Sequence, residues 1–145
     1  MTDVVCDASI VLKWFHDDGD AEVEGSRRLL AAHRDGQLTA LILDLTLYEL
    51  GNVMLRALRW RSAEVVAQLD DIRSICAILA PGAIELRLAV ELAEAHALTY
   101  YDAVYAAAAR SRGAVLVTAD RALLDAGVAE PPGLVAARLG ITKVL

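Results

Sequence analysis

The sequence has few of the features that mark secreted or membrane-embedded proteins. It contains two cysteines, Cys6 and Cys76, and both lie in apolar stretches, which predicts reduced, buried thiols rather than a disulfide or a ligand pair. No apolar run approaches the roughly 20 uninterrupted residues that a membrane helix needs. The start of the chain, at residues 1–3, places no basic residue ahead of an apolar stretch, which is not the pattern of a secretory signal. We therefore expect a cytoplasmic protein.

Positive charge is also scarce. The chain has 14 Lys and Arg against 20 Asp and Glu, a net charge of −6, which argues against a broad basic surface for nucleic acid. A role with nucleic acid would need another source of positive charge, such as a divalent metal ion. The hydrophobic fraction of 57% and the mean hydropathy of +0.43 are high for a chain of 145 residues, and they predict apolar surface that another subunit or a partner covers.

Short apolar runs alternate with longer segments of helical spacing along the chain. This rhythm predicts a single domain over residues 1–145, of the α/β class, in which helices cover a parallel sheet. We expect strands at 4–6, 38–43, 76–79 and 114–118, and helices at 8–15, 21–34, 45–60, 62–72, 83–96, 100–111 and 121–124. The segment after Asp125 is expected to be irregular apart from one possible edge strand.

Four acidic residues lie where such a fold could gather them. Asp7 directly follows the first expected strand, and Asp120 lies two residues beyond the last, so both belong to the sheet edge where ligands bind in open parallel sheets. Asp102 lies in the first turn of the alanine-rich helix, and Glu49 lies about one turn inside the helix after the second strand. The order of elements leaves their convergence open, because the geometry of the crossovers decides it.

Each of these acids also has a structural interpretation. Asp120 is placed to cap a short helix, and Asp102 has capping-box spacing from Thr99. Glu49 borders an apolar helical stripe, where an unpaired carboxylate is costly, so a structural interpretation is harder to sustain. Asp7 ends a strand expected to be central, and a carboxylate there needs a cap-like, pairing or metal-binding role.

The acids occur in four short segments of characteristic order and spacing. These are Val5-Cys6-Asp7-Ala8-Ser9, Tyr48-Glu49-Leu50-Gly51-Asn52, Tyr101-Asp102-Ala103 and Thr118-Ala119-Asp120. Together they resemble the PIN domains, and within that family the VapC toxins of bacterial toxin–antitoxin pairs. The resemblance covers nearly the whole chain, and it implies a three-layer α/β sandwich with a central parallel sheet flanked by helices.

The resemblance also implies an activity and partners. It implies a Mg²⁺- or Mn²⁺-dependent endoribonuclease that forms a homodimer and is neutralised by a small VapB-type antitoxin. By matching motif, the acidic quartet that would hold the metal corresponds to Asp7, Glu49, Asp102 and Asp120, and the accompanying polar positions to Ser9, Asn52 and Thr118.

Metal chemistry explains why such a quartet would be needed. Carboxylates at close range repel one another, and a hard cation with oxygen ligands and retained waters relieves that repulsion. The cation would lower the pKa of a bound water and offset charge on the phosphate. No histidine is required, and His16, His33 and His96 lie in a loop or near helix ends, where we expect surface or capping roles.

Candidates for contact with the RNA backbone are fewer. Lys13, about one turn from Ser9, and Arg121, beside Asp120, are the side chains best placed to bind phosphate. A basic stretch at 56–61, which includes Trp60, is also compatible with RNA binding, but a solvated helix end or a dimer contact is the favoured interpretation.

Two other functions remain as alternatives. One is an aspartate-based phosphatase or phosphotransfer domain of the haloacid-dehalogenase or receiver type, although Asp7-Ala8-Ser9 lacks the second aspartate of the dehalogenase motif. The other is a non-catalytic scaffold with a PIN-like fold, because fold does not fix function. The presence of all four acids argues against the scaffold.

Overall fold

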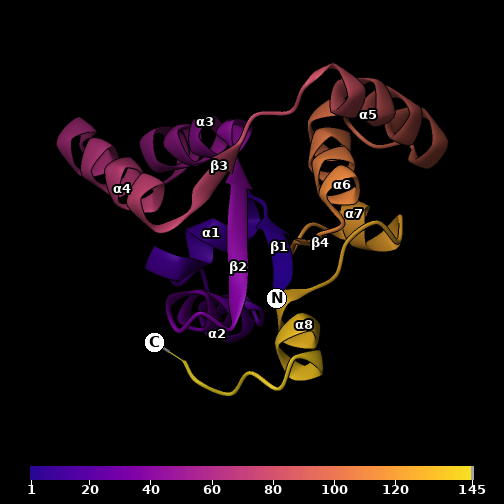
Figure 1. Ribbon diagram of the computed structural model, residues 1–145. Coiled ribbons are helices and arrows are strands. Elements are labelled where there is room, and N and C mark those ends of the chain that lie inside the picture. The colour runs from indigo at the N-terminus through magenta and orange to yellow at the C-terminus, as the bar shows by residue number, and fades with distance from the viewer. Residues whose placement is uncertain (145) are drawn as a thin grey trace.

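The computed structural model describes residues 1–144 and is built on a four-stranded parallel sheet (Figure 1). The strands are β1 (Thr2–Cys6), β2 (Leu38–Leu43), β3 (Ala77–Leu79) and β4 (Val115–Val117), in the order β3-β2-β1-β4. All four expected strands are present. The first strand of the chain therefore lies inside the sheet, with β2 on one side and β4 on the other.

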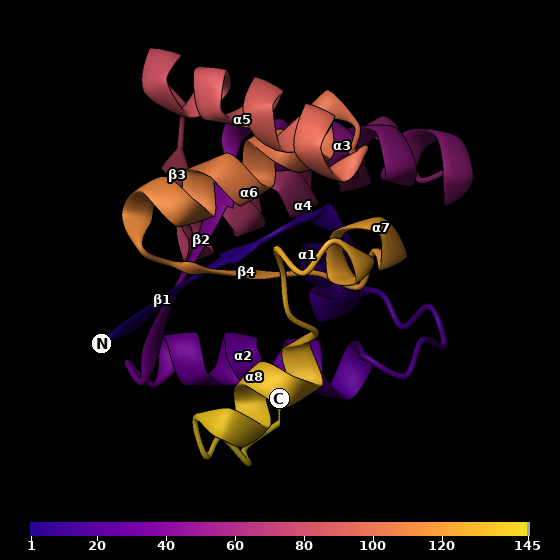
Figure 2. The same cartoon turned by 90° about the vertical axis from the view of Figure 1, so that its right-hand side faces the viewer.

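Helices cover both faces of this sheet. In Figure 1, α1 (Ala8–Phe15), α2 (Val23–Arg34), α3 (Asp44–Asn52) and α4 (Ser62–Ile75) lie on one side of β1 and β2, while α5 (Ala83–His96) and α6 (Tyr100–Arg112) lie on the other. Figure 2 looks at the molecule from the side of α5 and α6. The three-layer sandwich expected from the sequence is thus confirmed.

The alternation of side chains along the strands produces two hydrophobic cores. In β1, Val4 and Cys6 belong to the core beneath α1 and α2, whereas Val5 belongs to the core beneath α5 and α6. In β2, Ile42 and Leu41 divide in the same way. Strands buried on both faces read as nearly continuous apolar runs, and the sequence at 38–43 is apolar except for Thr39. Cys6 and Cys76 are buried and free, as predicted.

The order of the strands creates a switch point beside β1. The chain builds outward from β1 to β2 and β3, and then returns through α5 and α6 to place β4 on the opposite side of β1. Cys6 pairs with Val117, so the carboxyl ends of β1 and β4 are level, and the amide of Asp7 donates a hydrogen bond to the carbonyl of Val117 (3.3 Å). Ligand sites of open α/β sheets form at this kind of position.

The helix expected over 45–60 is interrupted. α3 ends at Asn52 and continues into a π-helical turn, η1 (Val53–Ala57), and Arg59 then adopts a left-handed conformation with φ of +56°. A residue with positive φ cannot continue a right-handed helix, so the backbone turns there and Trp60 lies outside the helix. The prediction of a continuous helix to Trp60 was wrong.

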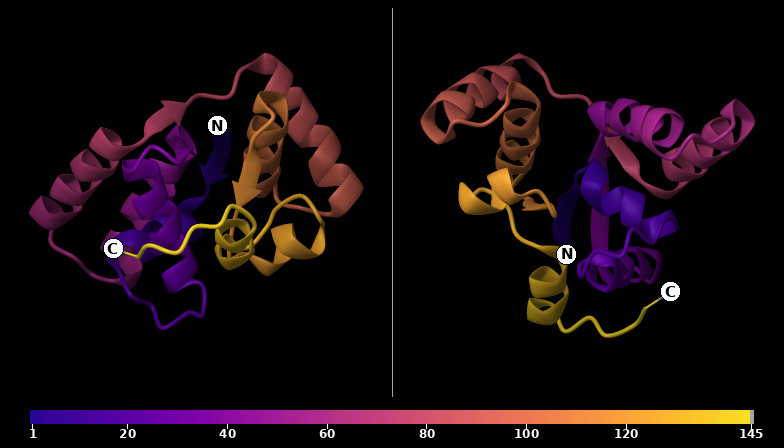
Figure 3. Two further views of the ribbon diagram at one scale, coloured as in Figure 1. Left: turned by 60° about the horizontal axis from the view of Figure 1, so that its bottom comes forward. Right: turned by 180° about the vertical axis from the view of Figure 1, so that it is seen from behind.

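The C-terminal segment is more ordered than expected. After α7 (Arg121–Asp125) it forms α8 (Pro132–Arg138), which packs beside α2 (Figure 3). Pro132 suits the first helical turn because its φ is fixed and it needs no amide partner. At the contact between the helices, a Cβ on Gly25 would lie 2.6 Å from the amide nitrogen of Gly133, so glycine is needed at 25. The expected irregular tail was wrong, although Glu130 does form one isolated parallel bridge with Val117.

Membrane-spanning potential can also be judged from the helices. Within residues 1–144, none combines the length and the apolar character needed to cross a bilayer.

Candidate active site

Asp7 is buried at the carboxyl end of β1, where it caps α1. Its side chain is 6% exposed, and Oδ1 accepts hydrogen bonds from Ser9 Oγ (2.6 Å) and from the amide of Ile10 (3.3 Å). Its second oxygen, Oδ2, accepts a hydrogen bond from Thr118 Oγ1. The carboxylate is therefore held by three donors, two of them hydroxyl groups at positions that the sequence had linked to the quartet.

The same hydroxyls connect the end of β1 to the end of β4. Ser9 Oγ accepts a hydrogen bond from the amide of Ala119 (3.0 Å), and Thr118 Oγ1 accepts one from the amide of Asp120 (3.0 Å). The turn after β4 is thereby fixed against the N-terminus of α1. This network sets the position of Asp120 relative to Asp7.

Asp120 and Asp102 both lie at helix starts. Asp120 caps α7, with Oδ1 accepting from the amide of Ala122 (2.9 Å), so the structural interpretation of this residue is realised. Thr99 caps α6, and its Oγ1 accepts a hydrogen bond from the amide of Asp102 (3.1 Å). Asp102 thus lies in the first turn of α6, as expected.

Glu49 reaches the site from α3 and is held by residues that the sequence analysis did not single out. Its Oε1 accepts a 2.6 Å hydrogen bond from the hydroxyl of Tyr105 on α6. That hydroxyl also lies 2.8 Å from Thr46 Oγ1, and Thr46 accepts a hydrogen bond from the amide of Leu43 (3.1 Å). No local pattern singles out Tyr105, which lies three residues after Asp102 and directly before the alanine run at 106–109.

The four carboxylates form one electrostatic cluster. Repulsion from Glu49 acts on Asp7, repulsion from Asp102 and Asp120 acts on Glu49, and repulsion from Asp120 acts on Asp102. Interactions of this kind require the groups to be close in space. The fold therefore places each of these acids near enough to at least one other for its charge to act, although the four are scattered over more than a hundred positions of the sequence.

Burial and repulsion together hold protons on these acids more tightly than usual. Burial raises the pKa of Asp7 to about 6, against the lowering effect of the hydrogen bonds from Ser9, Thr118 and the amide of Ile10. Burial also raises the pKa of Glu49, with the hydrogen bond from Tyr105 acting in the opposite direction. The pKa of Asp102 is raised by burial and by the charge of Asp120.

The cluster has oxygen donors and no cationic partner, which suits a hard metal ion. None of its four acids takes part in an ion pair within residues 1–144. In the same residues, no group of three or more His, Cys, Asp or Glu side chains is close enough to hold an ion jointly. The fit to Mg²⁺ therefore rests on the carboxylate oxygens as donors, because Mg²⁺ usually retains several waters and binds proteins through one or two carboxylates.

The other residues predicted to belong to the site, Asn52, Arg121 and Lys13, differ in how far their side chains are exposed to solvent. Asn52 is exposed on α3, one turn beyond Glu49, and Arg121 is 79% exposed, with an ion pair to Asp125 (2.8 Å). The side chain of Lys13 is only 4% exposed, and its Nζ donates to the carbonyl of Ser9 and to Asp18 Oδ2, both at 3.1 Å. This burial argues against the expected contact between Lys13 and RNA phosphate.

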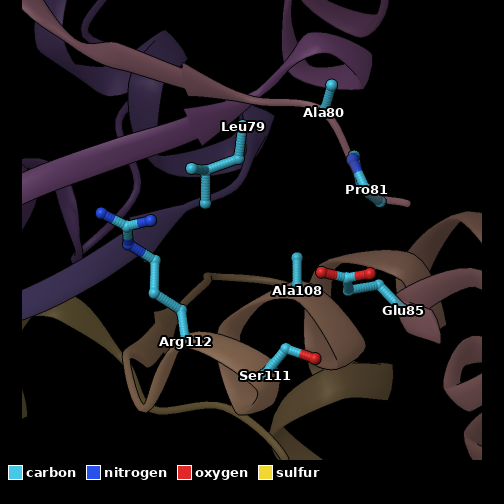
Figure 4. A pocket seen from close by; sticks show the side chains of 7 residues that line it. All are labelled: Leu79, Ala80, Pro81, Glu85, Ala108, Ser111 and Arg112. Carbon is cyan, nitrogen blue, oxygen red and sulfur yellow. The ribbon is translucent and has the colours of Figure 1, made fainter. Parts of the chain in front are cut away.

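Other surface features do not extend the site. Trp60 packs edge-on against Phe15, with ring centroids 5.8 Å apart, so its ring contributes to the core. A cavity of about 220 Å³ lies between the end of β3, the start of α5 and the end of α6, and is lined by residues including Glu85, Ser111 and Arg112 (Figure 4). None of the four acids lines it, and Asp102 is at the opposite end of α6 from Arg112.

Comparison with known proteins gives the family. The PIN domain family model matches residues 4–128. A curated relative from Pyrobaculum aerophilum, Exonuclease VapC9, is 40% identical over 106 residues, which cover 66% of this chain and 75% of the relative.

Solved structures agree with this assignment. PAE2754 from P. aerophilum matches with a TM-score of 0.70 at 28% identity, over 97% of this chain and 91% of that one. VapC20 from Mycobacterium tuberculosis, described as a sarcin-ricin loop cleaving toxin, matches with a TM-score of 0.67 at 22% identity, over 86% and 95% of the chains. VapBC2 from Rickettsia felis, bound to a promoter DNA fragment, gives a TM-score of 0.65 at 19% identity, over 88% and 96%.

The chain belongs to the PIN domain family. Within that family its similarity is to nucleases of the VapC type, as the resemblance in the four acidic segments had indicated.

Proposed function

We propose that the protein is a Mg²⁺- or Mn²⁺-dependent endoribonuclease, the toxin of a VapBC-type pair, and that its site consists of Asp7, Glu49, Asp102 and Asp120. The observation that carries this proposal is the electrostatic coupling of four carboxylates, none of which has a cationic partner among residues 1–144, near the switch point of a parallel sheet. A purely structural cluster of acids would normally be neutralised by lysine or arginine.

The acids would hold the metal, which when bound supplies the positive charge that activates a water and offsets charge on the scissile phosphate. Ser9 and Thr118 fix the carboxylate of Asp7 through their hydroxyl hydrogen bonds. Asn52 offers an exposed amide near Glu49, for contact with the substrate. Arg121 is the proposed phosphate contact, because its ion pair with Asp125 is solvent-exposed and therefore weak.

Metal dependence gives the first test. RNA cleavage should require Mg²⁺ or Mn²⁺ and stop when EDTA is added. The variants Asp7→Asn, Glu49→Gln, Asp102→Asn and Asp120→Asn should each lose activity, whereas Asp125→Asn, a change of the same kind outside the quartet, should retain it. Cleavage that survives EDTA would contradict the metal mechanism.

The position of the cut gives a second test. The relative VapC9 is named an exonuclease, whereas VapC20 is described as cleaving a loop, which lies between the ends of an RNA. We propose internal cleavage, as in VapC20. A circular RNA has no ends, so an endonuclease should linearise it and an exonuclease should leave it intact. An intact circle beside a degraded linear RNA of the same sequence would show exonuclease action.

The proposed partners are an RNA substrate, a second copy of the chain and a VapB-type antitoxin. Two separate apolar surfaces support two protein interfaces: one on α3 and α4, with Tyr48 and Val66 exposed, and one on α5, with Leu86 and Val90 exposed.

The antitoxin would direct an arginine to the acids, because a guanidinium pairs bidentately with carboxylates. A toxin and antitoxin of this kind would act in the cytoplasm, where the free thiols of Cys6 and Cys76 stay reduced.

The alternatives make different predictions. A PIN-like scaffold should show no change on adding Mg²⁺, and a phosphatase should hydrolyse a generic phosphomonoester such as p-nitrophenyl phosphate. Metal-dependent RNA cleavage without phosphomonoester hydrolysis would exclude both.

A further inference from the structure

Tyr105 is buried between α3 and α6, unlike the other three tyrosines of the chain. Its side chain is 2% exposed, whereas Tyr48, Tyr100 and Tyr101 are exposed. Its hydroxyl makes two short contacts, to Glu49 Oε1 at 2.6 Å and to Thr46 Oγ1 at 2.8 Å. A buried hydroxyl with two polar partners is a specific arrangement, because each unmet hydrogen bond in the interior is costly.

The direction of these hydrogen bonds follows from counting protons. An ionised carboxylate only accepts, so the single hydroxyl proton of Tyr105 is donated to Glu49. Tyr105 must then accept from Thr46, whose own oxygen accepts from the amide of Leu43 (3.1 Å). The chain of donors therefore runs from the last residue of β2, through two hydroxyls, to the carboxylate of Glu49.

We propose that Tyr105 is a positioning residue that holds Glu49 in the orientation needed for metal binding, with Thr46 fixing Tyr105 in turn. The hydrogen bond engages Oε1 and leaves Oε2 for a ligand. Groups that hydrogen-bond to metal-ligating side chains fix their orientation, and their loss typically weakens metal affinity or activity by about 10- to 100-fold. This inference rests on the proposed function, because it requires Glu49 to bind the metal.

A positioning role for Tyr105 and a purely structural role predict different effects on metal affinity. Glu49 is repelled by Asp102 and Asp120, so without Tyr105 its side chain would rotate away from them toward solvent. A tyrosine that only joined α3 to α6 would contribute to stability alone. Removing its hydroxyl would then lower the free energy of unfolding and leave the affinity of the folded protein for metal unchanged.

The test compares Tyr105→Phe and Thr46→Val with Thr46→Ser, which keeps the hydroxyl. Tyr48→Phe is the matched control, because it removes a hydroxyl from a side chain that is 73% exposed. Titration calorimetry with MnCl₂ gives the affinity, RNA cleavage gives kcat and KM, and urea unfolding without metal gives stability. We expect Tyr105→Phe to raise the Kd for Mn²⁺ by about 10- to 100-fold and to lower kcat more than it raises KM.

Thr46→Val should shift the Kd for Mn²⁺ in the same direction by a smaller factor, and Thr46→Ser and Tyr48→Phe should behave as wild type. Wild-type affinity and kcat in both Tyr105→Phe and Thr46→Val would overturn the inference. If Tyr105→Phe does not fold, Thr46→Val decides, because it leaves the tyrosine in place.

Glu49→Gln separates this inference from the proposed function. If Glu49→Gln weakens Mn²⁺ binding and abolishes cleavage while Tyr105→Phe changes neither, the positioning role is wrong and the proposed function stands. If Glu49→Gln binds Mn²⁺ and cleaves RNA as wild type does, the proposed site is wrong and the positioning role is wrong with it.

Discussion

Thr118 and Asp7 lie 111 residues apart in the chain and are joined by a hydrogen bond from Thr118 Oγ1 to Asp7 Oδ2. The parallel pairing of β4 with β1 makes this contact possible, because Cys6 and Val117 are partners in the register and the next residue of each strand is therefore level. The hydroxyl supplies one of the three donors that hold a buried carboxylate.

Replacing Thr118 by Val should therefore destabilise the metal-free protein. The substitution keeps the shape of the side chain, but it removes a donor to Asp7 and an acceptor for the amide of Asp120. Leaving these buried groups unpaired should lower the free energy of unfolding by about 1–3 kcal/mol, as measured by urea denaturation. Thr118→Ser retains the hydroxyl and should lie closer to wild type, and equal losses in the two variants would contradict the role given to the hydrogen bond.

Much of this fold was predictable because its signals are local. The strand at 38–43 is apolar except for Thr39, and the start of α6 at Tyr100 is marked by Thr99, whose hydroxyl caps the helix. Gly113 then ends α6 with a φ of +68°, which glycine adopts at little cost. Pattern and capping chemistry fix such elements before any tertiary contact forms.

The errors occurred where tertiary packing decides the structure. Apart from its prolines, the sequence at 131–138 has no local pattern that predicts a helix. We attribute α8 to its packing on α2, where Gly25 permits the two helices to approach closely. His33 was expected to have a surface or capping role, yet its Nε2 lies 2.8 Å from the carbonyl of Ile75, and its Nδ1 accepts from the amide of Ala40 (3.1 Å). Contacts of this kind join different helices and strands, so they leave no periodic signal in the sequence.

The family motifs proposed Asp7 and Glu49 as site residues, and they also named Ser9 and Thr118, whose hydroxyls donate to Asp7. The burial of Lys13 and the hydrogen bond from Tyr105 to Glu49 were not predicted, because they depend on how α1 and α6 pack. Neither residue type carries a local signature of its role. A lysine near a proposed metal site suggests phosphate binding until its ion pair with Asp18 is seen.

Self-association should involve α5. The α3–α4 surface is hollowed, with a groove of about 370 Å³ that includes Tyr48 and Val66, and suits a protruding segment of another protein, whereas α5 presents an exposed helix. We therefore expect Val90→Glu to convert a dimer to a monomer in light scattering, and Val66→Glu to leave it dimeric. Wild-type protein at micromolar concentration with a mass near 15.5 kDa would contradict the dimer itself.

The raised pKa of Asp7 predicts how stability depends on pH. Burial raises this pKa from the ordinary 3.8 to about 6, so the folded state binds a proton more tightly than the unfolded state does. The contribution of Asp7 to stability is therefore fully present below about pH 4 and is lost as the pH rises through about 6. Asp7→Asn has no such titration, so the stability of the mutant relative to wild type should increase between pH 4 and 7. A constant difference across that range would contradict this prediction.

Asp7→Asn in the presence and absence of Mg²⁺ separates a metal ligand from a structural acid. Without metal, the variant relieves repulsion from Glu49 and the cost of burying a charge, so it should be at least as stable as wild type, with a gain on the order of 1 kcal/mol.

With Mg²⁺, wild type should gain thermal stability, because the ion binds only the folded state, and the variant should lose most of that gain together with its RNA cleavage. An acid that served only as a helix cap would behave in the opposite way, since its loss would cost about 1 kcal/mol and leave the Mg²⁺ shift intact. Melting curves for the two proteins with and without Mg²⁺ distinguish these cases. A variant that melts several degrees lower without metal, yet keeps the full Mg²⁺ shift, would establish Asp7 as structural.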